Sequence, residues 1–158
     1  MYNILFVCYG NICRSPMAEM IFKDLIYKNS KRYMFSCVSR ATSVEEIGND
    51  IYPKAREVLI KNGITIEKHS ATQVTKIDYE KYDYIICMEE RNRRDLIRIF
   101  GEDIENKIHL LLEYSDGGEI DDPWYTGKFD ECFSLIYEGC LGLYNYLLDL
   151  GDKNGEEI

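Results

Sequence analysis

Residues 3–16 read NILFVCYGNICRSP, and this stretch decides the fold. Its first five residues, Asn3–Val7, form a short apolar run rich in β-formers, which predicts a buried strand. The loop that follows contains Gly10 and Asn11, two residue types that tolerate positive φ. Ser15-Pro16 then predicts the start of a helix, because a hydroxyl residue caps a first turn and proline suits its first position. The stretch therefore predicts a strand, a tight loop and a helix.

The same alternation continues along the rest of the chain. Further strands are predicted at Tyr33–Ala41, Tyr84–Met88 and Ile108–Leu112. Helices are predicted at Ser15–Asn29, Pro53–Asn62, Glu89–Phe100 and Asp130–Leu150, with a polar loop from Tyr114 to Lys128 and a frayed tail after Gly151. Buried strands that alternate with helices imply a parallel sheet. We expect an α/β fold in one domain, residues 1–158: a small parallel β-sheet of about four strands with helices on both faces.

Composition and charge exclude several classes of function. The chain has 46% hydrophobic and 30% charged residues, a balance typical of globular proteins. No charged-then-apolar leader and no membrane-length apolar segment occur, so we expect a cytoplasmic protein without a membrane span. The net charge of −9 disfavours nucleic acid and anionic membranes as partners. The same charge repels phosphate, so any anion site would need a strong local field.

Six cysteines raise the question of disulfides or metal. Without a secretory leader a disulfide scaffold is not expected, because the cytosol keeps thiols reduced. No Cys-x2-Cys pair occurs and His69 is far from His109, so neither a metal nor a cofactor is expected. Four cysteines lie within apolar patterns and are predicted to be small buried side chains: Cys37, Cys87, Cys132 and Cys140. Cys8 and Cys13 need another explanation.

The loop between the first strand and helix is a candidate phosphate-binding loop. It consists of Cys8, Tyr9, Gly10, Asn11, Ile12, Cys13, Arg14 and Ser15. Its backbone N–H groups can form a nest for a tetrahedral anion, and the following helix adds its positive end. The Arg14 guanidinium matches two phosphate oxygens, and such positive potential favours the thiolate form of Cys8. An isolated Cys-x5-Arg would more simply be a buried thiol and a surface arginine, but the strand before and the helix start after favour a nucleophile.

The segment VCYGNICRSPMAE, from Val7 to Glu19, resembles the signature of the low-molecular-weight protein tyrosine phosphatases. The resemblance extends over essentially the whole chain and includes Gly63-Ile64, His69, Gln73-Val74-Thr75, Tyr82-Asp83-Tyr84-Ile85, Cys87-Met88, Arg94-Asp95-Leu96 and Asp122-Pro123-Trp124-Tyr125. It implies hydrolysis of phosphotyrosine monoesters through a cysteinyl-phosphate intermediate, with acid phosphatase activity on small aryl phosphates. It also implies phosphotyrosine proteins or peptides as partners and phosphate and similar oxyanions as inhibitors. The oligomeric state stays open, with a monomer as the expectation.

The resemblance also implies the catalytic roles. Cys8 would attack phosphorus, Arg14 would hold the phosphoryl oxygens, and Asp122 would act first as general acid and then as base. On the residues alone, an aspartate before proline is more often a turn former, and Asp121 is a competing candidate. Cys13 would trap oxidised Cys8 as a reversible disulfide, whereas its simpler reading is a buried thiol.

Supporting roles follow from the same resemblance. Ser15 would hydrogen-bond the Cys8 sulfur, while Asn11 and His69 would brace the loop. For His69, the simpler interpretation is a structural histidine with its hydrogen bonds satisfied, and this differs little from a role in bracing the loop. Residues expected to line the substrate cleft are Tyr9, Glu45, Trp124 and Tyr125, although the two last could simply be aromatics that cover a loop.

The chain departs from the resembling family at several positions. Tyr9 stands where small or aliphatic residues are usual, and Thr72 where arginine is common. Glu45 and Glu46 stand where an aromatic residue is frequent, so acidic charge at the rim is expected to disfavour acidic peptides.

Two other functions remain open from the residues. A thiol-dependent arsenate reductase would share fold and loop, but it needs a downstream pair of cysteines, and Cys87 has no close partner in sequence. A non-catalytic phosphotyrosine-binding module would need neither the nucleophile Cys8 nor the acid Asp122.

Overall fold

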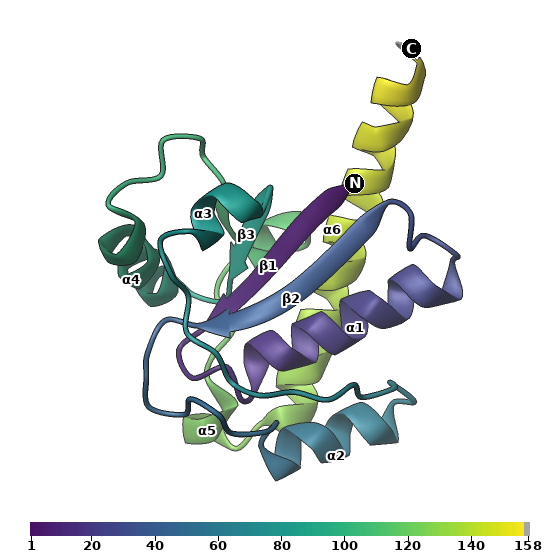
Figure 1. Cartoon of the computed structure of the whole chain (residues 1–158). Coiled ribbons are helices and arrows are strands. Elements are labelled where there is room, and N and C mark those ends of the chain that lie inside the picture. The colour runs from purple at the N-terminus through teal and green to yellow at the C-terminus, as the bar shows by residue number, and fades with distance from the viewer. Residues whose placement is uncertain (157–158) are drawn as a thin grey trace.

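Four parallel strands form the centre of the protein, and three of them are labelled in Figure 1. The computed structural model describes residues 1–156. The strands are β1 (Tyr2–Cys8), β2 (Phe35–Ala41), β3 (Tyr84–Cys87) and β4 (Ile108–Leu110), and their spatial order is β2-β1-β3-β4. Both β2 and β3 pair with β1 in parallel. Because β1 is flanked on both sides, its residues Ile4 to Val7 are fully buried.

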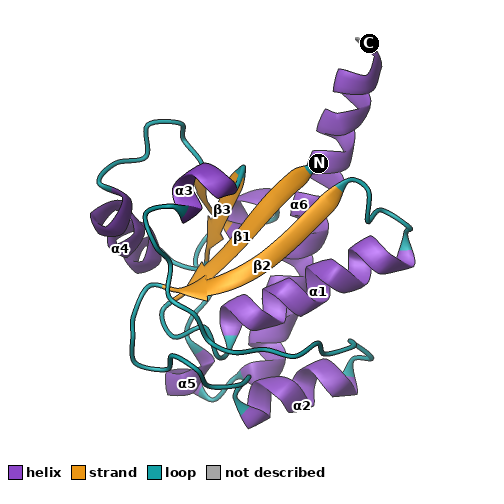
Figure 2. Cartoon of the chain, in the orientation of Figure 1, coloured by secondary structure: helices purple, strands orange, loops and turns teal. Residues whose placement is uncertain are grey.

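Helices cover both faces of this sheet (Figure 2). They are α1 (Arg14–Lys28), α2 (Pro53–Lys61), α3 (Asp78–Lys81), α4 (Glu90–Phe100), the 3₁₀ turn η1 (Leu111–Tyr114), α5 (Pro123–Thr126) and α6 (Phe129–Glu156). On one face α1 packs against α6, and α2 packs beside them; on the other face α4 covers β3 and β4. The expected parallel α/β sheet with helices on both faces is therefore confirmed.

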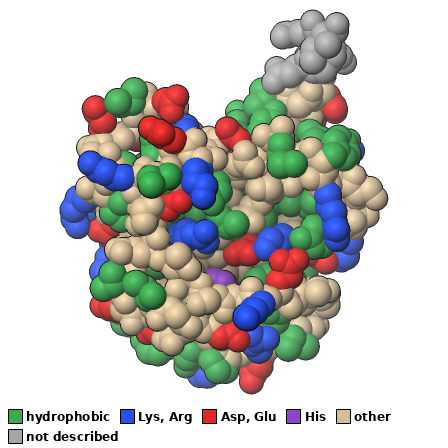
Figure 3. Space-filling model, viewed as in Figure 1, with side chains coloured by type: hydrophobic (Ala, Val, Ile, Leu, Met, Phe, Trp, Pro, Cys, Tyr) green, Lys and Arg blue, Asp and Glu red, His purple; other side chains and the backbone are tan. Residues whose placement is uncertain are grey.

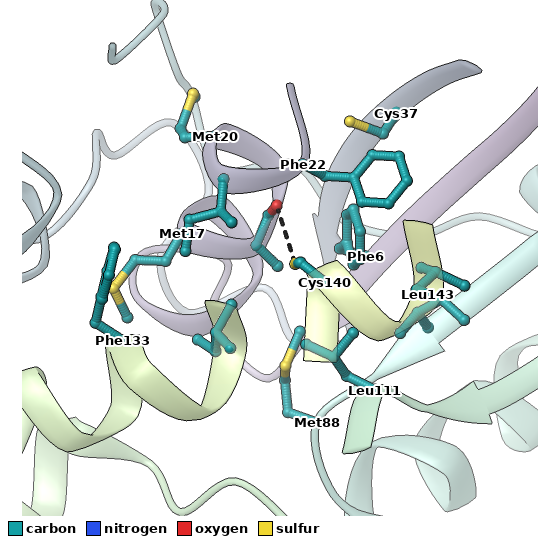
Figure 4. Close-up of a cluster of buried hydrophobic side chains, with 14 of the residues drawn as sticks. Phe6, Met17, Met20, Phe22, Cys37, Met88, Leu111, Phe133, Cys140 and Leu143 are labelled. Atoms are coloured by element: carbon teal, nitrogen blue, oxygen red, sulfur yellow. Dashed lines mark hydrogen bonds between the residues drawn. The ribbon is translucent and has the colours of Figure 1, made fainter. Parts of the chain in front are cut away.

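The alternation of side chains along β1 divides the core into two clusters. Ile4 and Phe6 point to the face covered by α1 and α6, whereas Leu5 and Val7 point to the face covered by α4. Figure 4 shows the first cluster, in which the Cys140 thiol donates to the Ala18 carbonyl oxygen at 3.7 Å. Complete burial of one such large apolar side chain stabilises the fold by about 1.5–3 kcal/mol. The packing of β1 in the core thus fixes the position of its last residue, Cys8.

The predicted cap of the first helix is wrong. Helix α1 begins at Arg14, its N-cap is Cys13, and no side chain caps it. The Ser15 hydroxyl instead lies 3.0 Å from the Cys8 sulfur. The hydroxyl is drawn into the loop because the loop curls back over Cys8, a tertiary contact that local capping preferences do not include.

Other predicted boundaries also change. The strand predicted to reach Leu112 ends at Leu110 and continues as η1, and the predicted polar loop contains the short helix α5. The short helix α3 was not predicted. The predicted fraying does not begin at Gly151, since α6 continues to Glu156; residues 157–158 of the predicted frayed tail lie outside the described residues. A side chain at Gly151 would press against the Met34 methyl group, so a glycine suits close packing there rather than a helix end.

The strand order places a crevice at the end of β1. The chain leaves β1 through α1 toward β2 on one side, while β3 and β4 lie on the other side. In open parallel sheets ligands bind where the strand order reverses in this way, beyond the carboxyl ends of the strands. Cys8 is the last residue of β1 and pairs with Ala41 of β2. The fold therefore brings Cys8 to the expected ligand-binding edge.

Two observations bear on a membrane contact: the helices of the described residues, and the charges on the face that Figure 3 shows. Among the residues that the structure describes, no helix is long and apolar enough to cross a bilayer. Acidic and basic side chains are interspersed over the face shown in Figure 3. On that face the net negative charge is not gathered into one patch.

Candidate active site

The loop after β1 wraps around the sulfur of Cys8. The Ser15 hydroxyl oxygen lies 3.0 Å from this sulfur. The backbone N–H groups of Asn11 and Ser15 donate to it over 3.3 and 3.5 Å. Cys8 is only 3% exposed, so water contributes little to its solvation. The sulfur is therefore held in a fixed position, surrounded by two backbone N–H groups and a hydroxyl.

Asn11 holds the loop in its curled shape. Its backbone has φ of 60°, the left-handed region that asparagine adopts more readily than most residues. Its side-chain amide donates to the hydroxyls of Ser15 and Ser39 over 2.8 and 2.9 Å. The Thr72 N–H donates to the Asn11 side-chain oxygen over 3.2 Å. Asn11 is fully buried, so these bonds satisfy polar groups that water cannot reach.

Two further groups brace Asn11 from outside the loop. The His69 Nε2 lies 2.7 Å from the Asn11 carbonyl oxygen, and because a carbonyl oxygen only accepts, Nε2 carries the proton. Ser39, which accepts from Asn11, donates in turn to the Glu19 carboxylate over 2.6 Å. Ser39 and Glu19 were missed in the sequence. Their only signal was a buried polar residue in the second strand and an acidic residue in the first helix.

Arg14 lies buried beside the same sulfur. Its NH1 donates to the Ile120 carbonyl oxygen over 2.8 Å and lies 3.2 Å from the Glu89 carboxylate. Its NH2 lies 3.5 Å from the Asp122 carboxylate. Burial opposes the positive charge, but the neighbouring Cys8, Asp122 and Glu89 side chains outweigh it and raise the pKa of Arg14. The guanidinium therefore stays charged and is held in a fixed orientation.

Glu89 was not predicted as a site residue. It directly follows Met88 at the carboxyl end of β3 and is the N-cap of α4, where it forms a capping box with Asn92. A carboxylate at the carboxyl end of a central strand was the signal that could have found it.

Several backbone amides of the loop remain available to a ligand. Within residues 1–156, hydrogen bonds leave the N–H groups of Gly10, Ile12 and Cys13 without a protein acceptor. All three residues line one cleft together with Cys8 and Arg14. Free amides, the start of α1 and a buried guanidinium together suit a tetrahedral oxyanion.

The cleft has a volume of about 130 Å³. It is lined by Cys8, Tyr9, Gly10, Ile12, Cys13, Arg14, Glu45, Glu46, Asp122, Trp124 and Tyr125. The structure thus brings the predicted nucleophile, arginine and aspartate to one cavity. The loop residues Asn11 and Ser15, and His69 outside the loop, do not line the cleft.

Asp122 reaches the cleft from the start of α5. It is the N-cap of this short helix, and its Oδ1 accepts from the Trp124 N–H over 3.0 Å. Pro123 occupies the first turn, which fixes the entry angle of the chain. The adjacent Asp121 lines a separate small cavity with Cys132 and Leu135. The geometry therefore separates the two candidate aspartates.

Two exposed aromatic residues flank the cleft. Trp124 is 52% exposed and Tyr125 is 80% exposed. The Trp124 ring packs edge-on against Tyr52 with 4.9 Å between ring centroids, and Tyr52 stacks on Phe129. Trp124 is thus supported from behind, and its free face is available to a flat ligand.

Tyr9 forms another part of the cleft wall. Its hydroxyl donates to the Glu45 carboxylate over 2.7 Å, and its carbonyl oxygen accepts from the Ser43 N–H and hydroxyl. The Arg91 guanidinium lies over its ring, 4.5 Å from the centroid. The hydrogen bond to Glu45 is the main cause that raises the pKa of Tyr9, and the Arg91 charge opposes it. Arg91 was missed in the sequence.

The cysteines other than Cys8 behave as buried thiols. All six cysteines are free and buried, which confirms the prediction for the four outside the loop. Burial, and then the neighbouring Cys8, raises the pKa of Cys13 far above its ordinary range. Burial also raises the pKa of Cys132 to about 12. These thiols stay protonated near neutral pH.

Fold and site together define the class of protein: a parallel α/β protein whose central strand ends in a cysteine-centred loop suited to oxyanions. Comparison with known proteins gives the family. The sequence profile of the low molecular weight phosphotyrosine protein phosphatases matches residues 3–152. The chain therefore belongs to this family of enzymes, which confirms the resemblance seen in the sequence.

Individual relatives agree with this assignment. The low molecular weight phosphotyrosine protein phosphatase of Gallus gallus is 42% identical over 143 residues, 88% of this chain and 89% of its own length. The low molecular weight protein-tyrosine-phosphatase YfkJ of Bacillus subtilis is 40% identical over 143 residues, 89% of this chain and 92% of its own. The crystal structure of YfkJ superposes with a TM-score of 0.90, covering 94% of this chain and 96% of that one at 38% identity.

Proposed function

We propose that this protein hydrolyses phosphotyrosine monoesters through a cysteinyl-phosphate intermediate. The observation that carries the proposal is the convergence of three donor groups on the Cys8 sulfur, in a cleft that also contains Arg14 and Asp122. A nucleophile, an oxyanion-binding group and a proton donor are the parts that phosphoryl transfer from an aryl ester requires.

In the first step the Cys8 sulfur forms a bond to phosphorus, and the bond from phosphorus to the tyrosyl oxygen breaks. The free loop amides and Arg14 hold the three remaining phosphoryl oxygens as their charge shifts. Asp122, protonated at this stage, donates its proton to the departing phenolate. The phosphoryl group remains on Cys8 and the tyrosine leaves as a neutral phenol.

In the second step water replaces the cysteine. The Asp122 carboxylate accepts a proton from the attacking water, the new oxygen–phosphorus bond forms, and the sulfur–phosphorus bond breaks. The hydroxyl of Ser15, 3.0 Å from the sulfur, stabilises the departing thiolate. Phosphate is released and Asp122 is protonated again for the next turnover.

The cleft walls support an aryl ester as the substrate. Trp124 and Tyr125 flank the mouth, where they can hold the phenyl ring of phosphotyrosine by stacking. The shorter side chains of phosphoserine and phosphothreonine would have to bring the peptide backbone down between these rings. The aromatic rim therefore supports a preference for phosphotyrosine.

The test is hydrolysis of three peptides that differ only in the phosphorylated residue. The phosphotyrosine peptide is expected to turn over roughly tenfold or more faster than the phosphoserine and phosphothreonine peptides, measured as released phosphate. p-Nitrophenyl phosphate serves as the small aryl substrate. Equal rates on the three peptides would argue against the proposed substrate class, and no release from any aryl ester would argue against the reaction.

We further propose that Cys13 protects Cys8 from irreversible oxidation. Hydrogen peroxide oxidises the Cys8 thiolate to a sulfenic acid and releases hydroxide. The Cys13 thiol then displaces the sulfenic oxygen as water and forms a Cys8–Cys13 disulfide. The raised pKa of Cys13 keeps this thiol protonated at neutral pH, so disulfide formation should become faster as the pH rises.

After brief peroxide treatment, mass spectrometry is expected to find a Cys8–Cys13 linkage, with activity lost and then regained in dithiothreitol. The Cys13→Ser variant should lose activity without recovery, because its Cys8 proceeds to sulfinic acid. Full recovery of this variant, or no linkage in the wild type, would refute the protective role.

We propose a single catalytic domain that acts as a cytoplasmic monomer and is inhibited by phosphate and similar oxyanions. The oxyanion part rests on the free loop amides beside Arg14. Arsenate reduction gains no support, because Cys87 is fully buried and burial raises its pKa to about 12, which does not suit a relay thiol.

A further inference from the structure

Arg91 places a positive charge at the mouth of the cleft. It belongs to the first turn of α4, two residues after Glu89, which contacts Arg14. Its guanidinium lies 4.5 Å from the centre of the Tyr9 ring, and Tyr9 lines the cleft directly after Cys8. Arg91 is therefore a neighbour of the proposed substrate site but not part of the phosphate-binding loop.

The guanidinium of Arg91 is held in place without being neutralised. It stacks over a tyrosine ring that is itself fixed by Glu45 and by Ser43, so less side-chain freedom is left to lose on binding. In the part of the chain that the structure describes, no carboxylate lies within ion-pair distance of Arg91. Among the described residues the Arg91 guanidinium also donates no hydrogen bond, unlike those of Arg93 and Arg98 on the same helix, so its N–H groups are available to a ligand.

Unlike Arg91, the two acidic residues of the rim accept hydrogen bonds from neighbouring side chains. The Glu45 carboxylate accepts from the Tyr9 hydroxyl, and the Glu46 carboxylate accepts from the Asn49 side chain over 2.6 Å. Glu45 and Arg91 both contact Tyr9, Glu45 at its hydroxyl and Arg91 over its ring. The mouth therefore carries a basic residue as well as two acidic ones, which the rim sequence alone did not indicate.

We propose that Arg91 is a specificity-determining residue that binds an acidic side chain next to the phosphotyrosine of a substrate. The inference rests on the proposed function and names a substrate class for it: phosphotyrosine peptides that carry a glutamate or aspartate within a few residues. A second group for anions has a physical use here, because a protein with a net charge of −9 repels acidic peptides unless a local cation offsets the repulsion.

The experiment compares kcat and KM on three phosphotyrosine peptides of equal length, with glutamate, lysine or only neutral neighbours, and on p-nitrophenyl phosphate. In Arg91→Ala, kcat/KM on the glutamate peptide is expected to fall about three- to fivefold, mainly through KM, as for loss of one partly exposed ion pair. The neutral peptide and p-nitrophenyl phosphate should change by less than about 1.5-fold. Arg91→Lys should recover part of the loss, because it keeps the charge without the fork.

The matched control is Arg94→Ala. Arg94 is an exposed arginine of the same helix that does not line the cleft, and its removal changes the net charge equally. Arg94→Ala should leave the ratio between the glutamate and neutral peptides unchanged. An equal loss in both variants would mean long-range charge alone and would overturn the proposal, as would an equal loss on all substrates.

Glu45→Gln removes a negative charge from the rim, whereas Arg91→Ala removes a positive one. Glutamine keeps an oxygen that can accept from the Tyr9 hydroxyl. This variant should raise kcat/KM on the glutamate peptide and lower it on the lysine peptide, which tests the sequence expectation for the rim.

A non-hydrolysable phosphonate version of the glutamate peptide gives a Kd that does not depend on turnover. If the wild type hydrolysed nothing but Arg91→Ala still weakened this Kd, the proposed function would fail and the Arg91 assignment would stand; an unchanged Kd would overturn it.

Discussion

Replacement of Cys8 by serine is expected to abolish hydrolysis of p-nitrophenyl phosphate, lowering kcat by roughly four orders of magnitude or more. A serine hydroxyl is not ionised near neutral pH, and the donors that surround position 8 stabilise an anion that serine does not form. The change replaces the sulfur atom with a smaller oxygen atom, so the loop is expected to keep its shape. Initial rates with enzyme in the micromolar range would measure the residual activity.

Two controls separate lost chemistry from lost structure. The Cys8→Ser variant should still bind inorganic phosphate, because the loop amides and Arg14 are unchanged, and calorimetry or a thermal shift would detect this. Cys13→Ser makes the same atomic change in the same loop and should retain activity within about tenfold. Substantial turnover by Cys8→Ser would remove Cys8 as the nucleophile.

Replacement of Asp122 by asparagine is expected to lower kcat on phosphotyrosine by about 10²- to 10³-fold, the usual contribution of a general acid. Asparagine can still accept from the Trp124 N–H and cap α5, so the change removes the acid with little change to the loop. Asp122→Ala should lose at least as much activity and also some stability of α5. Phosphate binding should remain largely intact in both variants.

The leaving group provides the sharpest check on this role. p-Nitrophenolate leaves without much help from a proton, whereas the tyrosine phenolate needs one more strongly. The loss in Asp122→Asn should therefore be smaller on p-nitrophenyl phosphate than on phosphotyrosine when the first step is followed in single-turnover experiments. Asp121→Asn is the matched control, since Asp121 lines a different cavity. An equal loss on both substrates, or a loss in Asp121→Asn instead, would reassign the acid.

The order of strands and helices could be predicted because its signals are local. Apolar runs such as Asn3–Val7 report a buried strand within a few residues, and alternation with helices then implies a parallel sheet. Element ends were less predictable where a tertiary contact decides them. Ser15 faces Cys8 instead of capping α1, and the strand at Ile108 turns into η1 after three residues.

The residues of the candidate site also fall into a group that could be predicted from the sequence and a group that could not. The phosphate-binding loop is continuous in sequence, so its residues could be named together. Ser39 comes from β2, and Glu89 and Arg91 come from the start of α4; only the folded chain brings them to the loop or its mouth. Their sequence signals were weak: Ser39 is a polar residue within a strand and Glu89 is a carboxylate directly after one. Nothing in the residues next to Arg91 distinguishes it from a solvated arginine.

The bracing of Asn11 has a consequence for how the enzyme treats small oxyanions. The hydrogen bonds that join Asn11 to its neighbours, donated to Ser15 and Ser39 and accepted from Thr72 and His69, exist before any ligand arrives. The curled backbone therefore loses its conformational freedom when the chain folds and not at each catalytic cycle. A receptor that is already rigid can hold a ligand of very few atoms. Phosphate release and inhibition by tetrahedral ions should accordingly depend only on how well the ion fits the phosphate-binding loop. The peptide that carried the phosphate should make no contribution to either.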